Sequence, residues 1–299
     1  MNKKLINWGI FILLAVIWGS SFLLMKIGMQ AGSVQLSPYQ VASLRMVFAG
    51  IVLVPFAFQA LKNIPKNKIG LVILSGVIGN FIPAYLFCIA ETKIDSALAG
   101  ILNSLTPLFT ILVGMAIFKV TIDLKKIGGI LLGLVGLCVS VVAGKTLHFE
   151  NFSFSFFIML ATICYGINVN MVGKHMQNIS AIHIASVAFS FSVIPGVIIL
   201  YMTGYFNYDF KDAALLHATL AGGTLGVINT SIASILFYIL VKRAGILFAS
   251  TVTYAIPFVS LAMGLIYNEP IHPLRLVGLA IILIGVYLVN KRSATKESK

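Results

Sequence analysis

Long uncharged apolar runs limit the fold of this sequence more than any other feature. Only 10% of the residues are charged and 59% are hydrophobic, whereas soluble domains carry about 25% charge. An apolar helix of about 20 residues crosses the hydrocarbon core of a bilayer. Eight runs of 18 or more residues contain no Asp, Glu, Lys or Arg, at 5–25, 69–90, 96–118, 127–144, 151–173, 184–208, 213–241 and 244–268.

Two further stretches qualify as spans if each tolerates one arginine. They are 37–61, which contains Arg45, and 272–290, which contains Arg275. The first run of the chain is interpreted as a retained helix, because it is longer than the apolar core of a signal peptide. The sequence therefore predicts an all-α polytopic membrane protein with ten transmembrane helices.

The basic residues indicate how these helices are oriented. The net charge is +13, and a cytoplasmic N-terminus places 15 lysines and arginines on the inside against four on the outer side. Cytoplasmic loops of membrane proteins carry this excess of positive charge. The charge therefore indicates topology in a plasma (inner) membrane rather than nucleic-acid binding, and an even number of helices returns the C-terminus to the cytoplasm.

The sequence also repeats itself at a shift of 150 positions. Gly76-Val77-Ile78 falls on Gly226-Val227-Ile228, and Phe87 falls on Phe237. The predicted repeats are 1–145 and 146–292, with five helices each, followed by a basic tail at 293–299. Because five is odd, the second repeat enters the membrane from the opposite side, which is the inverted arrangement of many secondary transporters.

The two repeats carry matched prolines near the middle of a span. Pro107 lies in NSLTPLFTILVG and Pro257 lies in TYAIPFVSLAMG, 150 positions later. A proline within a helix frees the carbonyl four residues before it, here those of Asn103 and Thr253. In hydrocarbon such a carbonyl needs a partner. The pattern favours a central binding site with both prolines as hinges, although a simple packing kink is the alternative.

Several stretches resemble the drug/metabolite transporter superfamily, in particular its ten-helix members with two EamA-type domains. They include IWGSSFLLMKIGM at 17–29, SPYQVASLRMVFAG at 37–50 and SALAGILNSLTPLFTILVGMAIF at 96–118. The region 249–288 of the second half is similar as well. The resemblance covers almost the whole chain and implies the movement of small metabolites, often amino acids. The chain departs from the family pattern at Lys119, where an acidic residue is usual, but keeps Glu269 at the matching position.

Polar and aromatic residues within the spans are the candidate substrate-binding residues, because such groups usually face a bundle interior or a cavity. The spans at 127–144 and 276–290 contain almost none and are expected to be scaffold, which leaves the cavity to the other eight. An amide in a span is also commonly a contact between helices. The candidates are Trp18, Lys26, Arg45, Asn80, Tyr85, Asn103, Tyr165, Asn168, Asn170, Asn229 and Tyr254.

Among these candidates, Lys26 and Arg45 are the cations that would attract a carboxylate. Lys26 is expected near the outer end of its span, where its long side chain reaches water. Arg45 is expected deeper in its span, so it is the stronger candidate. Pairing with helix-end carbonyls is the structural alternative for both residues.

Several functions are disfavoured by what the sequence lacks. No Asp or Glu falls at the centre of a predicted span, which disfavours proton coupling through a buried carboxylate. The five histidines lack metal-ligand spacing, and no serine-hydrolase motif is present. Cys88, Cys138 and Cys164 fall within spans and are expected to be packing residues.

The sequence therefore predicts a non-enzymatic membrane carrier for small metabolites such as amino acids. Its expected partners are the small-molecule substrate and the lipid bilayer, and not nucleic acid. It works by alternating access, as an exporter or facilitator, without cofactor or metal. The sequence does not indicate an oligomeric state. The alternatives are a transporter of another small organic solute, such as a drug, nucleobase or sugar derivative, and a membrane scaffold or sensor.

Overall fold

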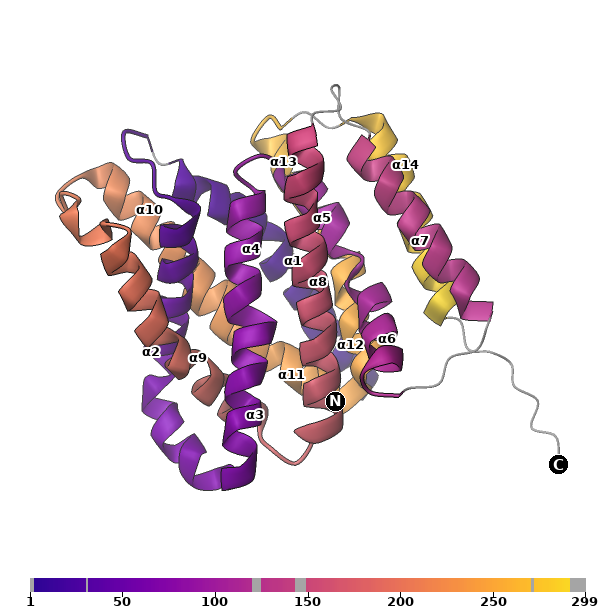
Figure 1. Cartoon of the computed structure of the whole chain (residues 1–299), viewed down its shortest axis with the longest axis horizontal. Helices are drawn as coiled ribbons and strands as arrows, with labels where there is room; N and C mark the ends of the chain where they lie inside the picture. The colour runs from indigo at the N-terminus through magenta and orange to yellow at the C-terminus, as the bar shows by residue number, and fades with distance from the viewer. Residues whose placement is uncertain (1–2, 31, 120–124, 143–148, 270–271, 291–299) are drawn as a thin grey trace.

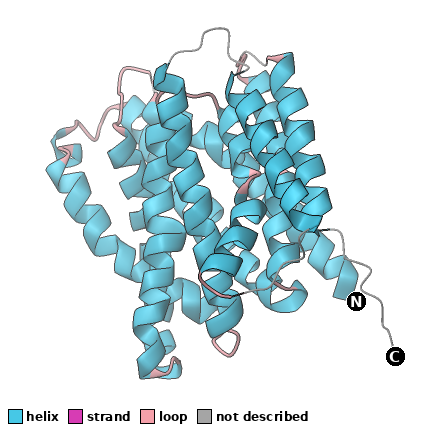
Figure 2. Ribbon diagram, turned by 45° about the vertical axis from the view of Figure 1, so that its right-hand side comes forward, coloured by secondary structure: helices cyan, strands magenta, loops and turns pink. Residues whose placement is uncertain are grey.

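The computed structural model describes residues 3–30, 32–119, 125–142, 149–269 and 272–290, and helices dominate these ranges (Figures 1 and 2). The basic tail expected at 293–299 lies outside them. The elements of the first half are α1 (Lys3–Met29), α2 (Pro38–Asn63), α3 (Lys66–Gly76), the π-helix η1 (Val77–Phe81), α4 (Ile82–Ala90), α5 (Ser96–Asn103), α6 (Thr106–Ala116) and α7 (Lys125–Val142).

The second half follows a similar order of elements. They are α8 (Phe149–His175), α9 (Ala181–Met202), the short 3-10 helix η2 (Tyr205–Asn207), α10 (Ala213–Thr224), the π-helix η3 (Leu225–Ile232), α11 (Ala233–Ala244), α12 (Ile246–Ser250), the 3-10 helix η4 (Thr251–Tyr254), α13 (Ile256–Ile266) and α14 (Pro273–Asn290).

Eight helical segments among the described residues are long and apolar enough to cross a membrane. Two further helices contain shorter apolar segments, Leu131–Ser140 in α7 and Pro273–Leu288 in α14. The chain is therefore an all-helical polytopic membrane protein. The long spans are 4–29, 38–63, 66–90, 96–116, 153–175, 181–202, 213–244 and 246–266.

Polar residues at helix starts determine where several of these elements begin. Ser37 forms a capping box with Gln40 ahead of α2, and Pro38 occupies the first turn, where no intrahelical N–H is needed. Asp95 accepts a hydrogen bond from the backbone N–H of Leu98 at the start of α5. These caps satisfy donors that would otherwise lack partners at the ends of the spans.

The span 96–116 is two helices rather than one bent helix. α5 ends at Asn103 and α6 begins at Thr106, so Pro107 occupies the first turn of a new helix. The side chain of Thr106 donates a hydrogen bond to the carbonyl of Asn103 at 2.7 Å. The carbonyl of Asn103 therefore has its partner within the protein, in the hydroxyl next to the proline.

The matching break in the second half has the same proline position. Pro257 lies in the first turn of α13, after the 3-10 helix η4. Proline is tolerated there because its missing N–H has no intrahelical acceptor to lose. Each proline therefore marks a change of helix near the middle of its span.

Two other spans contain a π-helical turn, which the apolar pattern does not reveal. η1 interrupts the span 66–90 just before Pro83, and η3 interrupts the span 213–244. In η3 the hydroxyl of Thr230 bonds to the carbonyl of Leu225, five residues earlier, at 2.8 Å. π-Turns within α-helices are rare and are frequent at functional sites.

Most of the helix packing joins the first half of the chain to the second. α2 packs along α9, α1 packs against α10, α11 and α13, and α8 packs against α4 and α6. α7 and α14 pack along each other at one side of the bundle (Figure 1). A Cβ atom on Gly285 of α14 would lie 2.6 Å from the backbone nitrogen of Gly133 of α7, so glycine permits this close approach.

The three cysteines are free thiols and do not form a disulfide. Cys88 and Cys164 are buried, in agreement with a packing role, but Cys138 is exposed on α7. The prediction of packing is therefore wrong for Cys138, because its side chain is not covered by other described residues.

Candidate functional site

A cavity lies inside the bundle where the interrupted helices meet. Its volume is about 70 Å³, and it is lined by residues from both halves of the chain. Among the described residues, α7, α9 and α14 contribute nothing to it. The lining comprises Trp18, Ser21, Phe22, Met25, Arg45, Gly79, Asn80, Phe87, Asn103, Thr106, Tyr165, Asn168, Val169, Asn229, Ser234, Phe237, Tyr238, Ser250 and Thr253.

This lining agrees with the expected scaffold role of α7 and α14, but it also corrects one expectation. Eight spans were expected to form the cavity, and α9 does not contribute. α9 instead packs along the full face of α2 and against α3. Its small and β-branched residues are therefore used for helix contacts.

Arg45 is the charged residue of the cavity lining. Its side chain lies on α2 and is only 8% exposed, and its Nε donates a hydrogen bond to the hydroxyl of Thr230 at 2.7 Å. No ion pair found among the described residues includes Arg45. Because a buried guanidinium requires compensation for its charge, this site is suited to an anionic group such as a carboxylate.

Two amides of the lining converge on one tyrosine. Asn80 of η1 and Asn168 of α8 both donate to the hydroxyl of Tyr238, at 3.2 and 3.4 Å. The side-chain oxygen of Asn168 accepts from Ser75, and that of Asn80 accepts from Ser234. Each amide therefore has partners for both of its polar atoms. Half-buried Asn80 also holds α11 against η1.

Trp18 and Asn229 connect α1 to the π-helix η3. The indole nitrogen of Trp18 donates to the carbonyl of Asn229 at 3.0 Å, and the amide nitrogen of Asn229 donates to the carbonyl of Ile17. The side-chain oxygen of Asn229 is buried and has no hydrogen-bond partner among the described residues. Since a buried acceptor without a partner is costly, this oxygen is a candidate contact for a donor on a bound molecule.

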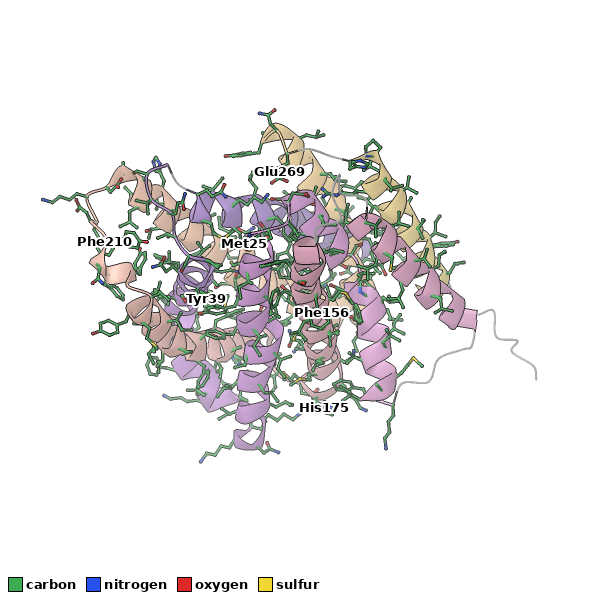
Figure 3. All side chains as sticks on the ribbon, turned by 45° about the horizontal axis from the view of Figure 1, so that its top comes forward. Met25, Tyr39, Phe156, His175, Phe210 and Glu269 are labelled. Atoms are coloured by element: carbon green, nitrogen blue, oxygen red, sulfur yellow. The ribbon has the colours of Figure 1, made fainter. Side chains whose placement is uncertain are left out.

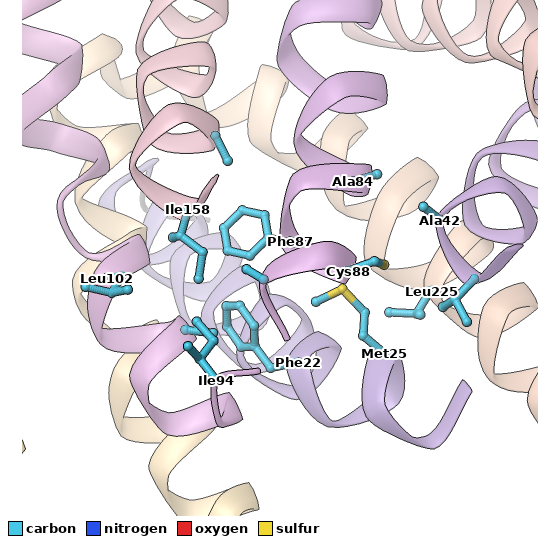
Figure 4. Close-up of a cluster of buried hydrophobic side chains, with 14 of the residues drawn as sticks. Phe22, Met25, Ala42, Ala84, Phe87, Cys88, Ile94, Leu102, Ile158 and Leu225 are labelled. Atoms are coloured by element: carbon cyan, nitrogen blue, oxygen red, sulfur yellow. The ribbon is translucent and has the colours of Figure 1, made fainter. Parts of the chain in front are cut away.

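Aromatic rings enclose the rest of the cavity. Phe22 contacts Phe87 with ring centroids 5.8 Å apart, and Phe87 stacks on Tyr165 at 6.0 Å. Trp18 contacts Phe237 at 5.2 Å. Phe22 and Phe87 belong to the buried cluster drawn in Figure 4, together with Met25 and Cys88. These rings provide apolar surface beside a few polar groups, as in sites for small organic molecules.

Ion pairs close one end of the bundle, which we call the Lys26 end and define by Lys26, Asp95, Ser96, Glu269 and Arg275. The Nζ of Lys26 lies 2.6 Å from Oε1 of Glu269, which also accepts from the hydroxyl of Ser96 at 3.0 Å. The backbone N–H of Ser96 donates to Oε2 of Glu269 at 3.1 Å.

The second ion pair of the Lys26 end joins Arg275 to Asp95. Together the two pairs tie α1 and α14 to the start of α5 and to the loop after α13. Figure 3 shows Glu269 at one end of the bundle and His175 at the other.

Lysines at the opposite end of the bundle have a different kind of partner. Lys68 donates to the carbonyl of His175 at 2.7 Å, and Lys174 donates to the carbonyl of Phe118 at 3.0 Å. These carbonyls lie at helix C-termini, where a positive charge is favourable. The ion pairs of Lys26 and Arg275 lie at the other end.

The structure brings seven of the eleven candidate residues into the cavity lining and places four outside it. Lys26 pairs with Glu269, and the hydroxyl of Tyr85 shares a hydrogen bond with Ser43 at 2.8 Å. The amide of Asn170 donates to the carbonyls of Thr110 and Gly166, both at 2.8 Å, and Tyr254 is half-buried outside the lining. The seven lining candidates are Trp18, Arg45, Asn80, Asn103, Tyr165, Asn168 and Asn229.

Several lining residues could not be predicted by considering polar residues one at a time. Applying the shift of 150 positions to the candidates would have found two of them, because Thr253 matches Asn103 and Gly79 matches Asn229. Tyr238 and Ser234 have no such signal. Among the described residues no group of three or more His, Cys, Asp or Glu side chains is placed to hold a metal ion.

The chain matches the model of the EamA-like transporter family twice, at residues 7–142 and 153–291. It is 23% identical over 287 residues to an uncharacterized transporter of Archaeoglobus fulgidus, covering 96% of this chain and 99% of the relative. It is 21% identical to a probable amino-acid metabolite efflux pump of Salmonella typhimurium, covering 93% of this chain and 92% of the relative.

A third relative and a solved structure extend the comparison. The chain is 25% identical to the S-adenosylmethionine/S-adenosylhomocysteine transporter of Chlamydia trachomatis serovar L2, covering 92% of this chain and 86% of the relative. A protein crystal structure with 17% sequence identity has the same fold, with a TM-score of 0.66 over 94% of this chain and 95% of that chain. The relatives are named as transporters rather than enzymes, and two family matches cover most of the sequence. The chain therefore belongs to the EamA-like transporter family.

Proposed function

We propose that this transporter carries amino acids or similar small metabolites with a carboxylate across the plasma membrane by alternating access at the central cavity. The single observation that carries the proposal is buried Arg45, which lines the cavity without an acidic partner among the described residues. The names of two relatives, an amino-acid metabolite efflux pump and an S-adenosylmethionine transporter, support the same chemical class, because each of these solutes carries an α-carboxylate.

The cavity offers groups for the rest of such a substrate. The free side-chain oxygen of Asn229 is suited to accept from an ammonium group, and the aromatic rings provide contact for a side chain. The volume of about 70 Å³ is below the 300–1,000 Å³ of sites for drug-sized ligands. The size therefore favours a small metabolite, and a larger solute requires the cavity to widen.

We further propose that the cavity lies between two inverted repeats, 1–145 and 146–292, each with five spans. Four pairs of lining positions are 150 residues apart: Trp18 and Asn168, Gly79 and Asn229, Phe87 and Phe237, and Asn103 and Thr253. The two separate family matches support the same division. α7 and α14 are then the fifth and tenth spans, each 18 residues long.

The proposed orientation places both chain termini in the cytoplasm. It is supported by the lysines that cap helix C-termini at the end of the bundle where α1 begins, and by the charge asymmetry of the loops. The Lys26 end then faces outward. Its ion pairs form the outer gate of the cavity, and alternating access requires them to separate.

The matched prolines are proposed as the hinges of this movement. Replacing Pro107 and Pro257 with alanine removes the steric block to a continuous helix through each break, and it is expected to lower the transport rate about tenfold, with normal expression. The measurement is initial flux into liposomes at matched protein amounts. Pro55 lies inside α2, outside the cavity lining, and its replacement by alanine is the control. A double variant that transports at the rate of the unchanged protein would remove the hinge role.

The substrate class is tested in two steps. A screen of amino acids, S-adenosylmethionine and non-carboxylate solutes on the purified protein is expected to raise the unfolding temperature only for carboxylate compounds, because a ligand that binds the folded state stabilises it. Compounds that stabilise the protein are then loaded into liposomes, where saturable flux is expected. Stabilisation by amines or sugars alone would contradict the proposal.

A further inference from the structure

Glu91 is a buried carboxylic acid that the proposed transport site does not use. It follows Ala90, the last residue of α4 and of its span, and its backbone N–H donates to the carbonyl of Phe87 at 2.9 Å. The residue is 4% exposed, and neither carboxyl oxygen has a hydrogen-bond partner among the described residues. A buried ionised carboxylate without partners is unfavourable, so the neutral acid is the form that this environment favours.

Two of the charged groups around Glu91 form ion pairs with other residues. Lys26 of α1 pairs with Glu269, and Asp95 pairs with Arg275 while it caps α5. Burial raises the pKa of Glu91 well above its usual range, Lys26 and Arg45 oppose this shift, and Glu269 and Asp95 add to it.

The other titratable groups of this region are phenols, a thiol and an imidazole. Cys88 lies one turn before Glu91 on the same helix, and Tyr165 of α8 stacks on Phe87. Tyr85 is bonded to Ser43, and His272 lies just before α14. Lys26 and Arg45 are the positive charges that favour ionised Glu91.

Glu91 is connected to the cavity through α4 and lies near the outer gate. Phe87, one turn earlier on α4, lines the cavity, and Met25, beside Lys26, lines it as well. Phe87, Met25 and Cys88 belong to the same buried cluster (Figure 4). A change at Glu91 therefore affects both the Lys26 pair and the cavity wall.

We propose that Glu91 is a proton-binding site that controls the Lys26 end: the neutral acid keeps this end closed, and loss of the proton opens it. On opening, the O–H bond of the carboxyl breaks, the proton passes to an entering water molecule, and the carboxylate is left to compete with Glu269 for Lys26. One lysine then serves two carboxylates, which weakens the pair that closes the gate. The inference rests on the proposed alternating access, and it revises the expectation that no carboxylate is placed to bind a coupling proton.

The pH dependence follows from the sign of the shift. Because the pKa of Glu91 is raised in the closed conformation, closure is favoured at low pH and loses this advantage as the pH rises through that pKa. One proton is released for each opening. The population of the open state therefore rises about tenfold per pH unit between the pKa of Glu91 in the open conformation and its raised pKa in the closed one.

Native Cys88 provides a probe of this opening because it is fully buried and lies three residues before Glu91. With Cys138 and Cys164 replaced by alanine, Cys88 is the single thiol for alkylation by N-ethylmaleimide. Alkylation needs the thiolate, whose amount itself rises about tenfold per pH unit. The expected alkylation rate thus rises about 100-fold per pH unit when Glu91 is present, but only about tenfold in the Glu91→Gln variant.

Matched variants separate Glu91 from other groups. Glu91→Asp keeps a titratable acid and is expected to keep the steeper slope, while Asp209→Asn in an exposed loop and His272→Gln are expected to leave it unchanged. If Glu91→Gln does not fold, the slopes of the single-thiol protein and of Glu91→Asp decide the question. Equal slopes in the single-thiol protein and Glu91→Gln, or a single-thiol slope of only tenfold per pH unit, would overturn the proposal.

Infrared titration provides a second measurement that needs no substrate. The spectrum of the single-thiol protein minus that of Glu91→Gln is expected to retain the band of a protonated carboxyl at pH 7, far above the usual Glu pKa of about 4.3. Loss of that band near the usual pKa would overturn the proposal. Since neither measurement uses a transported solute, a wrong substrate class and a wrong role for Glu91 give different results.

Discussion

Replacing Arg45 with glutamine is expected to lower the flux of a carboxylate substrate about 100-fold. Hydrogen bonds to charged groups contribute about 1.5–3 kcal/mol, and about 1.4 kcal/mol corresponds to a factor of ten. Arg45 is buried in the cavity lining, and its Nε is oriented by Thr230. The measurement is the ratio of kcat/KM for the amino acid selected by the stability screen to that for its carboxamide analogue, in liposomes.

Two variants distinguish recognition of the carboxylate from support of the fold. Arg45→Lys keeps the charge but loses the planar fork, so we expect an intermediate loss for the carboxylate substrate. Thr230→Val removes the hydrogen bond that orients Nε and is expected to cost about tenfold or less. If Arg45→Gln lowers flux of the acid and of its carboxamide by the same factor, Arg45 does not bind the carboxylate.

Replacing Gly226 with valine is expected to destabilise the protein by about 3 kcal/mol, since overpacking of a tight contact costs about 1–3 kcal/mol or more. A Cβ atom on Gly226 would lie 2.5 Å from the carbonyl oxygen of Arg45 and 2.8 Å from the backbone nitrogen of Ala49. Both are backbone atoms of α2, so the clash is relieved only if α2 and η3 separate. Thermal unfolding in detergent measures the loss.

Gly70 provides the matched control for this substitution. It lies in α3, and a Cβ atom built there has nothing within 4 Å. Gly70→Ala is expected to stabilise α3 slightly, because alanine favours a helix by about 1 kcal/mol over glycine. Gly226→Ala, with the smallest possible side chain, should still lower the unfolding temperature. If Gly226→Ala and Gly70→Ala unfold at the same temperature, the contact between α2 and η3 is not tight.

Gly226 has a counterpart at the matching position of the first repeat, and this glycine also lies at a close helix contact. A Cβ atom on Gly76, 150 positions earlier, would lie 2.9 Å from the Cα of Ala188 on α9. Both glycines therefore permit close packing between a π-turn region and a helix of the other half. Their match in sequence is visible without a structure, but the partner helices are not.

Local signals in the sequence predicted the helices well. A span needs only consecutive apolar residues, so the uncharged runs coincide with the long helical segments 66–90 and 96–116. The prolines marked the central breaks, because a missing N–H acts on its own helix. The sequence predicted that the Asn103 carbonyl needs a partner, but only the structure identifies that partner as the hydroxyl of Thr106.

The cavity was predicted only in part for a similar reason. Trp18 and Asn229 were both candidates, yet their mutual contact joins residues 211 positions apart. Lys26 was a candidate for the cavity, but its partner Glu269 is 243 positions away. A sequence pattern identifies which side chains are costly in lipid, whereas the packing of helices selects the partners that relieve the cost.

The sequence by itself determined that this chain crosses the membrane many times and which of its residues are costly to bury. It also showed that the two halves share a pattern. These features can be read from the sequence because hydropathy, charge and backbone hydrogen bonding act over one span. Only the tertiary structure decided that Arg45 lines the cavity, that Lys26 pairs with Glu269, and that the carboxyl group of buried Glu91 has no hydrogen-bond partner among the described residues. The physical reason is that the electrostatic environment of a charge depends on groups brought close by folding, wherever they lie in the chain.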